Sequence, residues 1–93
     1  MDKQDKIMQM YQVISGLDDP ELCRLLFEDL CTQKEIEKMA ERLYAAGQLM
    51  EGKTYSQVIA TSDISSATLS RVSRCVQYGR GYSAVLKKDH FPK

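Results

Sequence analysis

The sequence predicts an all-α protein, a six-helix subunit of one domain that contains a helix-turn-helix. Apolar residues recur at spacings of three and four along most of the chain. Ser, Thr and Asp stand where helices would begin, Gly and Pro stand between them, and no stretch alternates like a strand. Because 93 residues are few for a self-sufficient core, we also expect burial against a second copy.

The first two predicted helices each carry one apolar stripe. In residues 3–17 the stripe consists of Ile7, Met10, Tyr11, Ile14 and Leu17. In residues 20–31 it consists of Leu22, Leu25, Leu26 and Leu30, broadened by Phe27. Asp19 is the predicted N-cap of the second helix, with Pro20 in its first turn. Neither helix is long enough to be stable alone, so both must dock on something.

The third and longest helix is the predicted spine. Thr32 and Glu35 form a capping-box pattern at its start, and Gly52 is a plausible C-terminal cap. Its apolar register runs to about Glu51 and includes the small residues 45–47, which would let another helix approach closely.

The predicted helix-turn-helix spans residues 54–78. A second capping-box pattern, Thr54 to Gln57, opens its first helix, and residues 63–65 make the turn. Ser65 or Ser66 caps its second helix, whose expected buried stripe is Leu69, Val72, Cys75 and Val76. A short sixth helix over 82–88, with Tyr82, Val85 and Leu86 inward, and a frayed tail from Asp89 complete the domain, residues 1–93. Residues 1–51 would then supply the dimerisation helices and the spine.

Charge is divided unevenly along a chain whose net charge is zero. Residues 1–51 hold 6 Lys/Arg against 11 Asp/Glu, which gives −5, whereas residues 52–93 hold 7 against 2, which gives +5. This division favours a polyanion facing the second half, although attraction between the halves would also explain it. The sequence has no apolar run of membrane length and no signal-peptide core, so we expect a cytoplasmic protein without membrane contact.

Double-stranded DNA is the predicted partner of the helix-turn-helix. An α-helix fits the major groove, and short side chains at its N-terminus allow close approach to base edges. Arginines further along can reach phosphate or guanine. The candidate DNA-binding residues are Lys53, Tyr55, Ser56, Gln57, Ser65, Ser66, Ala67, Thr68, Ser70, Arg71 and Arg74. The alternative for these residues is an ordinary helical hairpin with a solvated Ser/Thr face.

Catalytic, metal and cofactor sites are not predicted. The acidic cluster at residues 18–21 is explained by helix capping, and no nucleophile has a base at a suggestive spacing. Three cysteines without a CxxC pair and the lone His90 are too few ligands for an ordinary zinc site. We expect the protein not to be an enzyme.

Five short motifs follow one another in the middle of the chain: Leu30-Cys31-Thr32, Arg42, Leu49-Met50-Glu51-Gly52, Ser56-Gln57 and Ala67-Thr68-Leu69-Ser70-Arg71. By these motifs, residues 32–76 resemble the Trp repressor superfamily, and more closely its TrpR-like YerC/YecD branch. The resemblance covers about half of the chain directly. It implies an intertwined homodimer built from the outer helices, with a DNA-reading head formed by the fourth and fifth helices.

The resemblance also implies an effector pocket. In the repressor two arginines sandwich the corepressor tryptophan, and the matching positions here are Arg42 and Arg71, with Thr32 as the pocket threonine. Val72 and Cys75 stand where the repressor has a glycine and a serine, and a branched side chain there would fill the space of the indole ring. We therefore expect no response to tryptophan. Arg42 could bind another small anion or pair with Glu41 or Glu28.

These inferences predict a homodimeric, sequence-specific DNA-binding transcriptional regulator, a repressor by family, with an effector that is unknown. The alternative is a protein-interaction module that uses the same scaffold to bind a partner, for which an acidic partner would fit the positive second half. The sequence leaves open the operator, the target genes and the sign of regulation.

Overall fold

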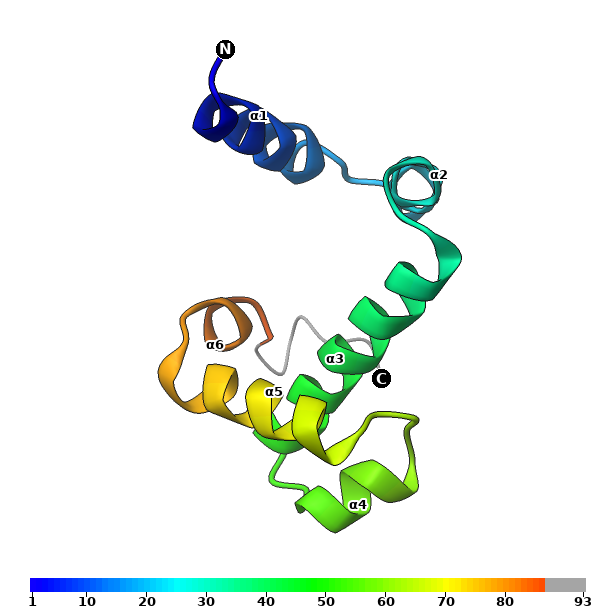
Figure 1. Cartoon of the computed structure of the whole chain (residues 1–93), viewed down its shortest axis with the longest axis vertical. Coiled ribbons are helices and arrows are strands. Elements are labelled where there is room, and N and C mark those ends of the chain that lie inside the picture. The colour runs from blue at the N-terminus through cyan, green and yellow to red at the C-terminus, as the bar shows by residue number, and fades with distance from the viewer. Residues whose placement is uncertain (87–93) are drawn as a thin grey trace. The chain divides into compact units, whose positions relative to one another are not determined.

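The computed structural model describes residues 1–86, and within them the chain forms six helices and no strand. The helices are α1 (Lys3–Ser15), α2 (Pro20–Leu30), α3 (Gln33–Met50), α4 (Tyr55–Ala60), α5 (Ser66–Tyr78) and α6 (Gly81–Val85) (Figure 1). The predicted all-α class is therefore confirmed. The predicted end of the sixth helix at Lys88, and the tail from Asp89 with His90, lie outside the described residues. None of the helices in residues 1–86 is long and apolar enough to cross a membrane.

Hydrogen bonds at the helix ends confirm the predicted caps. The Thr32 N–H donates to Glu35 Oε1 at 2.8 Å, and the Glu35 N–H donates to Thr32 Oγ1 at 3.1 Å. Thr54 and Gln57 form the same reciprocal pair, at 2.8 and 3.2 Å. Gly52, just after α3, has a φ of 94°, a left-handed conformation that favours glycine. Local sequence therefore fixes where α3 and α4 begin and where α3 ends.

The chain divides into two compact units, Met1–Ile36 and Glu37–Lys93, and the division falls within α3. The buried apolar residues all belong to the second unit: Ala45, Ala46, Val58, Ile64, Leu69, Val72 and Leu86. Leu49, Val76 and Tyr82 are partly buried against them. The C-terminal unit therefore has a core of its own, to which α3, α4 and α5 each contribute.

Small side chains on α3 make this core possible. Ala45 and Ala46 have no exposed surface, and Gly47 is also buried. Their size lets neighbouring side chains approach the α3 backbone, and Leu69 and Val72 of α5 are buried in the same cluster. The predicted role of residues 45–47 as a close-approach site is consistent with this packing. Ser73, which was not predicted to be inward, is also buried, at 7% exposed.

The sixth helix differs from the prediction of residues 82–88 in its bounds and in the direction of one side chain. α6 begins at Gly81 and ends at Val85, so it has only five residues. Leu86 leaves the helix with φ −89° and ψ 66° and is 7% exposed, whereas Val85 is 61% exposed. The expectation that Val85 faces inward is wrong for the single chain. Tyr82 and Leu86, four residues apart, share the inward side, and Val85 lies off that line.

The N-terminal unit is built differently, because neither α1 nor α2 has a buried residue. Eight of its large apolar side chains are 39–56% exposed: Ile7, Met8, Met10, Tyr11, Val13, Leu22, Leu25 and Leu30. The burial that the sequence pattern predicts for the leucine stripe of α2 does not occur within one chain. Only Leu26 and Phe27 of that stripe are half-buried. Amphipathic helices of this length are usually stabilised by a docking surface, and these two leave their apolar faces largely exposed.

Candidate nucleic-acid interface

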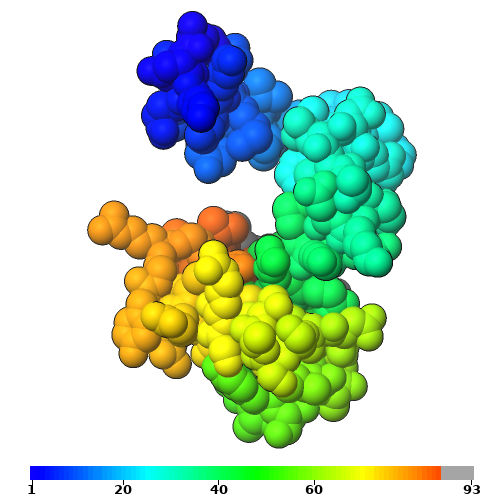
Figure 2. Space-filling model, in the orientation of Figure 1, coloured from blue at the N-terminus to red at the C-terminus, as the bar shows by residue number. Residues whose placement is uncertain are grey.

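Buried apolar side chains hold the turn between α4 and α5 in place: one in each helix and one in the turn itself. Val58 of α4 is 1% exposed, Leu69 of α5 is fully buried, and Ile64 in the turn is 8% exposed. The Tyr44 hydroxyl of α3 lies 3.4 Å from Thr61 Oγ1 at the end of α4. The helix pair is therefore held on the core of its unit, and α5 occupies much of the face of that unit shown in Figure 2.

The first turn of α5 combines one capping hydroxyl with several exposed short side chains. Ser65 is the N-cap: the Thr68 N–H donates to Ser65 Oγ at 3.2 Å, and Ser65 Oγ donates to Thr68 Oγ1 at 3.0 Å. Ser66, Ala67 and Ser70 are exposed. Of the predicted DNA-contacting hydroxyls, those of Ser65 and Thr68 thus already serve the helix start, while the exposed Ser66 and Ser70 take no part in that cap.

The start of α4 presents the other predicted DNA-contacting residues. Lys53, Tyr55 and Ser56 are exposed. Gln57 is exposed as well, but its side-chain oxygen accepts the Thr54 N–H in the capping box. Its side-chain amide remains available as a donor. All eleven residues predicted from the sequence to bind DNA therefore belong to the C-terminal unit. They lie near the start of α4, just before α5, or within α5.

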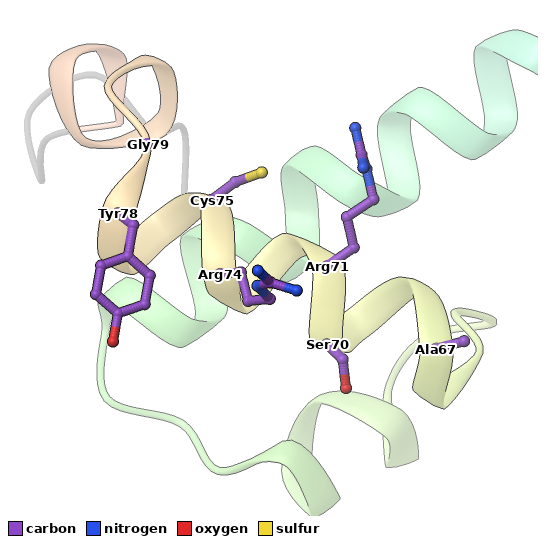
Figure 3. Close-up of a pocket in the computed structure, with 7 residues that line it drawn as sticks. All are labelled: Ala67, Ser70, Arg71, Arg74, Cys75, Tyr78 and Gly79. Carbon is purple, nitrogen blue, oxygen red and sulfur yellow. The ribbon is translucent and has the colours of Figure 1, made fainter.

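A hollow of about 580 Å³ runs along one face of α5 (Figure 3). It is lined by Ala67, Ser70, Arg71, Arg74, Cys75, Tyr78 and Gly79. Arg71 and Cys75 point to one side of the helix, Ser70 and Tyr78 point to the other, and Arg74 lies between them. Tyr78 and Gly79 were not among the residues predicted from the sequence for this surface. Helical spacing could have identified Tyr78, because it follows Ser70 and Arg74 at intervals of eight and four residues.

The charge of this face is positive and uncompensated. Arg71 and Arg74 are exposed, and in the part of the chain that the structure describes neither forms an ion pair. Asp63 is the single acidic residue between positions 52 and 86, against Lys53, Arg71, Arg74 and Arg80. Unpaired guanidinium groups on an open surface are suited to bind phosphate.

The perturbed ionisations lie instead in the N-terminal unit. Arg24 donates to Glu21 and Glu28, the latter at 2.8 Å, so the pKa of the Glu21 carboxyl is lowered and the pKa of Arg24 is raised. The Thr32 N–H and hydroxyl lower the pKa of the Glu35 carboxyl. These shifts reflect surface pairing and capping, and they do not mark a catalytic group.

The predicted effector-pocket residues are only partly assembled within the C-terminal unit. Arg71 and the half-buried Cys75 line the hollow together. Val72 is 2% exposed and belongs to the core, so it is not part of the lining. Thr32 lies in the N-terminal unit, where it caps α3.

Arg42 has none of the alternative ion pairs considered for it within its own unit. It is exposed, and the neighbouring Glu41 is not paired with it; Glu41 Oε2 is buried without a hydrogen-bond partner in the described residues. Glu28, the other carboxylate considered, pairs with Arg24. Arg42 thus remains available to a ligand or a partner molecule.

Among the described residues, no group of three or more His, Cys, Asp or Glu side chains is placed to hold a metal ion, and Cys23, Cys31 and Cys75 are free thiols in the structure.

The helices α4 and α5, joined by a tight turn and supported by α3, form the arrangement typical of helix-turn-helix proteins. The second helix of the motif, α5, is capped at its start and exposed on one face. The particular family follows from comparison, because the pattern of the Trp repressor protein family matches residues 5–90. This chain belongs to that family.

Relatives support the assignment. The chain is 45% identical over 71 residues to "Uncharacterized protein YerC" of Bacillus subtilis (strain 168), a match that covers 76% of this chain and 68% of the relative. It superposes on a TrpR-like protein from Eubacterium eligens with a TM-score of 0.88 and 34% identity, over 98% of this chain and 95% of the other. For a proposed Trp repressor from Staphylococcus aureus the values are 0.86 and 32%, over 96% and 91%.

Proposed function

We propose that the protein is a sequence-specific DNA-binding transcriptional regulator, a repressor by family, that acts as a homodimer in the cytoplasm. The observation that carries the proposal is the surface of α5, where short hydroxyl side chains at the N-terminal turn are followed by two arginines without ion pairs. Such a helix can enter the major groove with its first turn against base edges and its arginines against phosphate or guanine.

A homodimer explains the exposed apolar faces of the N-terminal unit. α1 and α2 have no buried residue, yet the two helices carry eight large apolar side chains that are 39–56% exposed, six of them on the predicted stripes. A second copy supplies an equal apolar surface, so that each copy covers the other, as in a two-fold interface. Two-fold symmetry then presents two α5 helices to successive major grooves of a roughly palindromic operator, with half-sites about one helical turn apart.

An effector, if one is required, would bind at the Arg71–Cys75 side of the hollow and engage Arg42. Val72 does not open space for a flat ring there, because its side chain is buried in the core. Tryptophan should therefore leave the thermal unfolding temperature unchanged, and a clear stabilisation by tryptophan would contradict this part of the proposal.

Selection from random duplexes, followed by gel shifts of the selected duplex at several salt concentrations, tests the proposed function. Wild type should retain a roughly palindromic duplex, and its affinity should fall steeply with salt. Arg71→Ala and Arg74→Ala should each weaken binding, with a salt slope smaller by about 1 for an arginine on phosphate. Lys3→Ala, on the acidic N-terminal unit, is the matched control and should bind like wild type.

Absence of any retained duplex at low salt would refute DNA binding and favour a protein-interaction module. Binding whose affinity and salt slope are the same in wild type and in both arginine variants would show instead that α5 is not the DNA-binding helix.

A further inference from the structure

Tyr78 is the most exposed of the large apolar or aromatic side chains described, with 83% of its surface accessible. The other tyrosines of the C-terminal unit are better accommodated. Tyr44 is half-buried and its hydroxyl is 3.4 Å from Thr61 Oγ1, Tyr82 is packed against the core, and Tyr55 is 44% exposed. The Tyr78 hydroxyl has no hydrogen bond within residues 1–86, and the ring has no place in the core. Its ring is therefore not explained by the packing of the fold.

The surroundings of Tyr78 are polar and positively charged. It shares the hollow on α5 with Arg74 and Ser70, and it points to the same side of the helix as Ser70 (Figure 3). Ser70, Arg74 and Tyr78 follow one another at intervals of four residues, so they form a line roughly 12 Å long on one face. No acidic residue lies between positions 64 and 86, where Arg71, Arg74 and Arg80 supply three positive charges.

The backbone after Tyr78 fixes the end of this line. The Gly79 N–H donates to the Cys75 carbonyl oxygen at 2.8 Å, and a Cβ atom at Gly79 would lie 2.6 Å from that oxygen. Glycine is therefore needed for the chain to turn tightly away from α5 toward α6. The turn leaves the last residue of α5 with its side chain exposed at the helix end.

We infer that Tyr78 is a DNA-contacting residue, whose hydroxyl donates a hydrogen bond to a backbone phosphate beside the phosphate bound by Arg74. This assignment rests on the proposed function and extends its contact surface from the N-terminal half of α5 to its C-terminal end. In the homeodomain variant of the helix-turn-helix, the C-terminal end of the recognition helix contacts the DNA backbone. Tyrosine hydroxyls are among the usual neutral donors to phosphate there.

The contact would position the protein and would not read sequence. Phosphate contacts fix register and orientation on the duplex but are the same for every base pair. Because the phenol is neutral, it also displaces no counterion, in contrast to Arg74. These two properties separate Tyr78 from a base-reading residue and from a charged one.

The test compares Tyr78→Phe with wild type on the selected duplex and on an unrelated duplex, with Gln77→Ala as the matched control. Gln77 is the exposed neighbour of Tyr78 but does not line the hollow. Tyr78→Phe should weaken binding to both duplexes by about tenfold, with an unchanged salt slope. Gln77→Ala should bind like wild type, and circular dichroism should show equal helix content in all three proteins.

A series of duplexes that each replace one phosphate with a neutral methylphosphonate supplies the second readout. At one position, the replacement should weaken DNA binding by wild type about tenfold. The same replacement should not weaken DNA binding by Tyr78→Phe any further. If wild type binds DNA and Tyr78→Phe binds it equally tightly, the assignment of Tyr78 is wrong, but the proposed function is not affected. A loss confined to the selected duplex, or a loss in Tyr78→Ala that Tyr78→Phe does not share, would also overturn that assignment. If wild type binds no duplex, the proposed function itself fails.

Discussion

The two units of this chain use the same kind of amphipathic helix with opposite results. α5 of the C-terminal unit buries Leu69 and Val72 completely or nearly so, whereas α2 of the N-terminal unit leaves Leu22 and Leu25 about half exposed. Both helices have a clear apolar stripe in sequence, and both begin with a side-chain cap. The difference is in burial, since α5 shares a buried apolar cluster with residues of α3 and α4, and α2 contributes no residue to that cluster.

The comparison teaches that an apolar stripe is buried only where the fold supplies a surface for it, as it does in the C-terminal unit. Small residues at 45–47 of α3 supply the close approach that α5 needs. We therefore expect substitutions in the C-terminal core to act on folding, and substitutions on the N-terminal apolar faces to act on association.

The largest effect is expected for Leu69→Ala. Leu69 has no exposed surface, so its truncation leaves a cavity at the centre of the C-terminal core. The free energy of unfolding should fall by about 3–4 kcal/mol in urea denaturation, as is usual for a leucine in a well-packed core. Leu30→Ala, at a residue 53% exposed in the N-terminal unit, is the comparison. An equal loss in both variants at concentrations where the protein is monomeric would remove the distinction between the units.

Leu25→Asp should separate association from folding. Leu25 is 47% exposed on α2, so the fold of one chain tolerates a carboxylate there, but an apolar interface between two copies does not. Sedimentation should show wild type as a dimer and the variant with affinity about a hundredfold lower, equivalent to about 2.7 kcal/mol. Asp29→Asn, at an exposed polar residue of the same helix, should remain dimeric. A wild type that sediments as a monomer at every accessible concentration would contradict the homodimer.

Ser65→Ala tests how much of the α5 surface is structural. Removal of the N-cap hydroxyl should reduce the free energy of unfolding by about 1 kcal/mol, because the Thr68 N–H loses its acceptor. Ser66→Ala is the matched control, since Ser66 is exposed and is not the cap of α5. It should leave stability unchanged and weaken DNA binding. The reverse pattern would show that Ser66, and not Ser65, caps α5 in solution.

The smallest effect is expected at the start of α3. The Thr32 N–H lowers the pKa of Glu35, so the charged carboxylate is favoured in the folded state. Its contribution to stability is present above the ordinary carboxyl pKa of 4.5 and is lost as the pH falls through the lower folded-state value. Unfolding measured between pH 6 and pH 3 should show a smaller pH dependence for Glu35→Gln, whose amide oxygen still accepts the Thr32 N–H. An unchanged pH dependence would exclude the contribution of Glu35.

Sequence was sufficient for the parts of the fold that depend on neighbours along the chain. The caps at Thr32, Thr54 and Ser65 and the left-handed glycine at position 52 each depend on residues no more than five positions away. The apolar stripe of α5 was predicted for the same reason, because helical geometry alone places Leu69 and Val72 on one side. The candidate DNA-binding residues also followed from this local order.

The rest required the tertiary structure. Periodicity alone could not distinguish a stripe that meets a partner helix from one that does not, so Leu69 and Leu25 looked alike. Nor could it foresee that Val85 turns outward, or that Tyr78 completes a hollow with two arginines. By itself the sequence determined which segments are helical, the caps at the starts of α3, α4 and α5, and the basic second half of the chain. Only the tertiary structure decided which apolar faces are covered, because burial depends on residues that are distant in sequence and close in space.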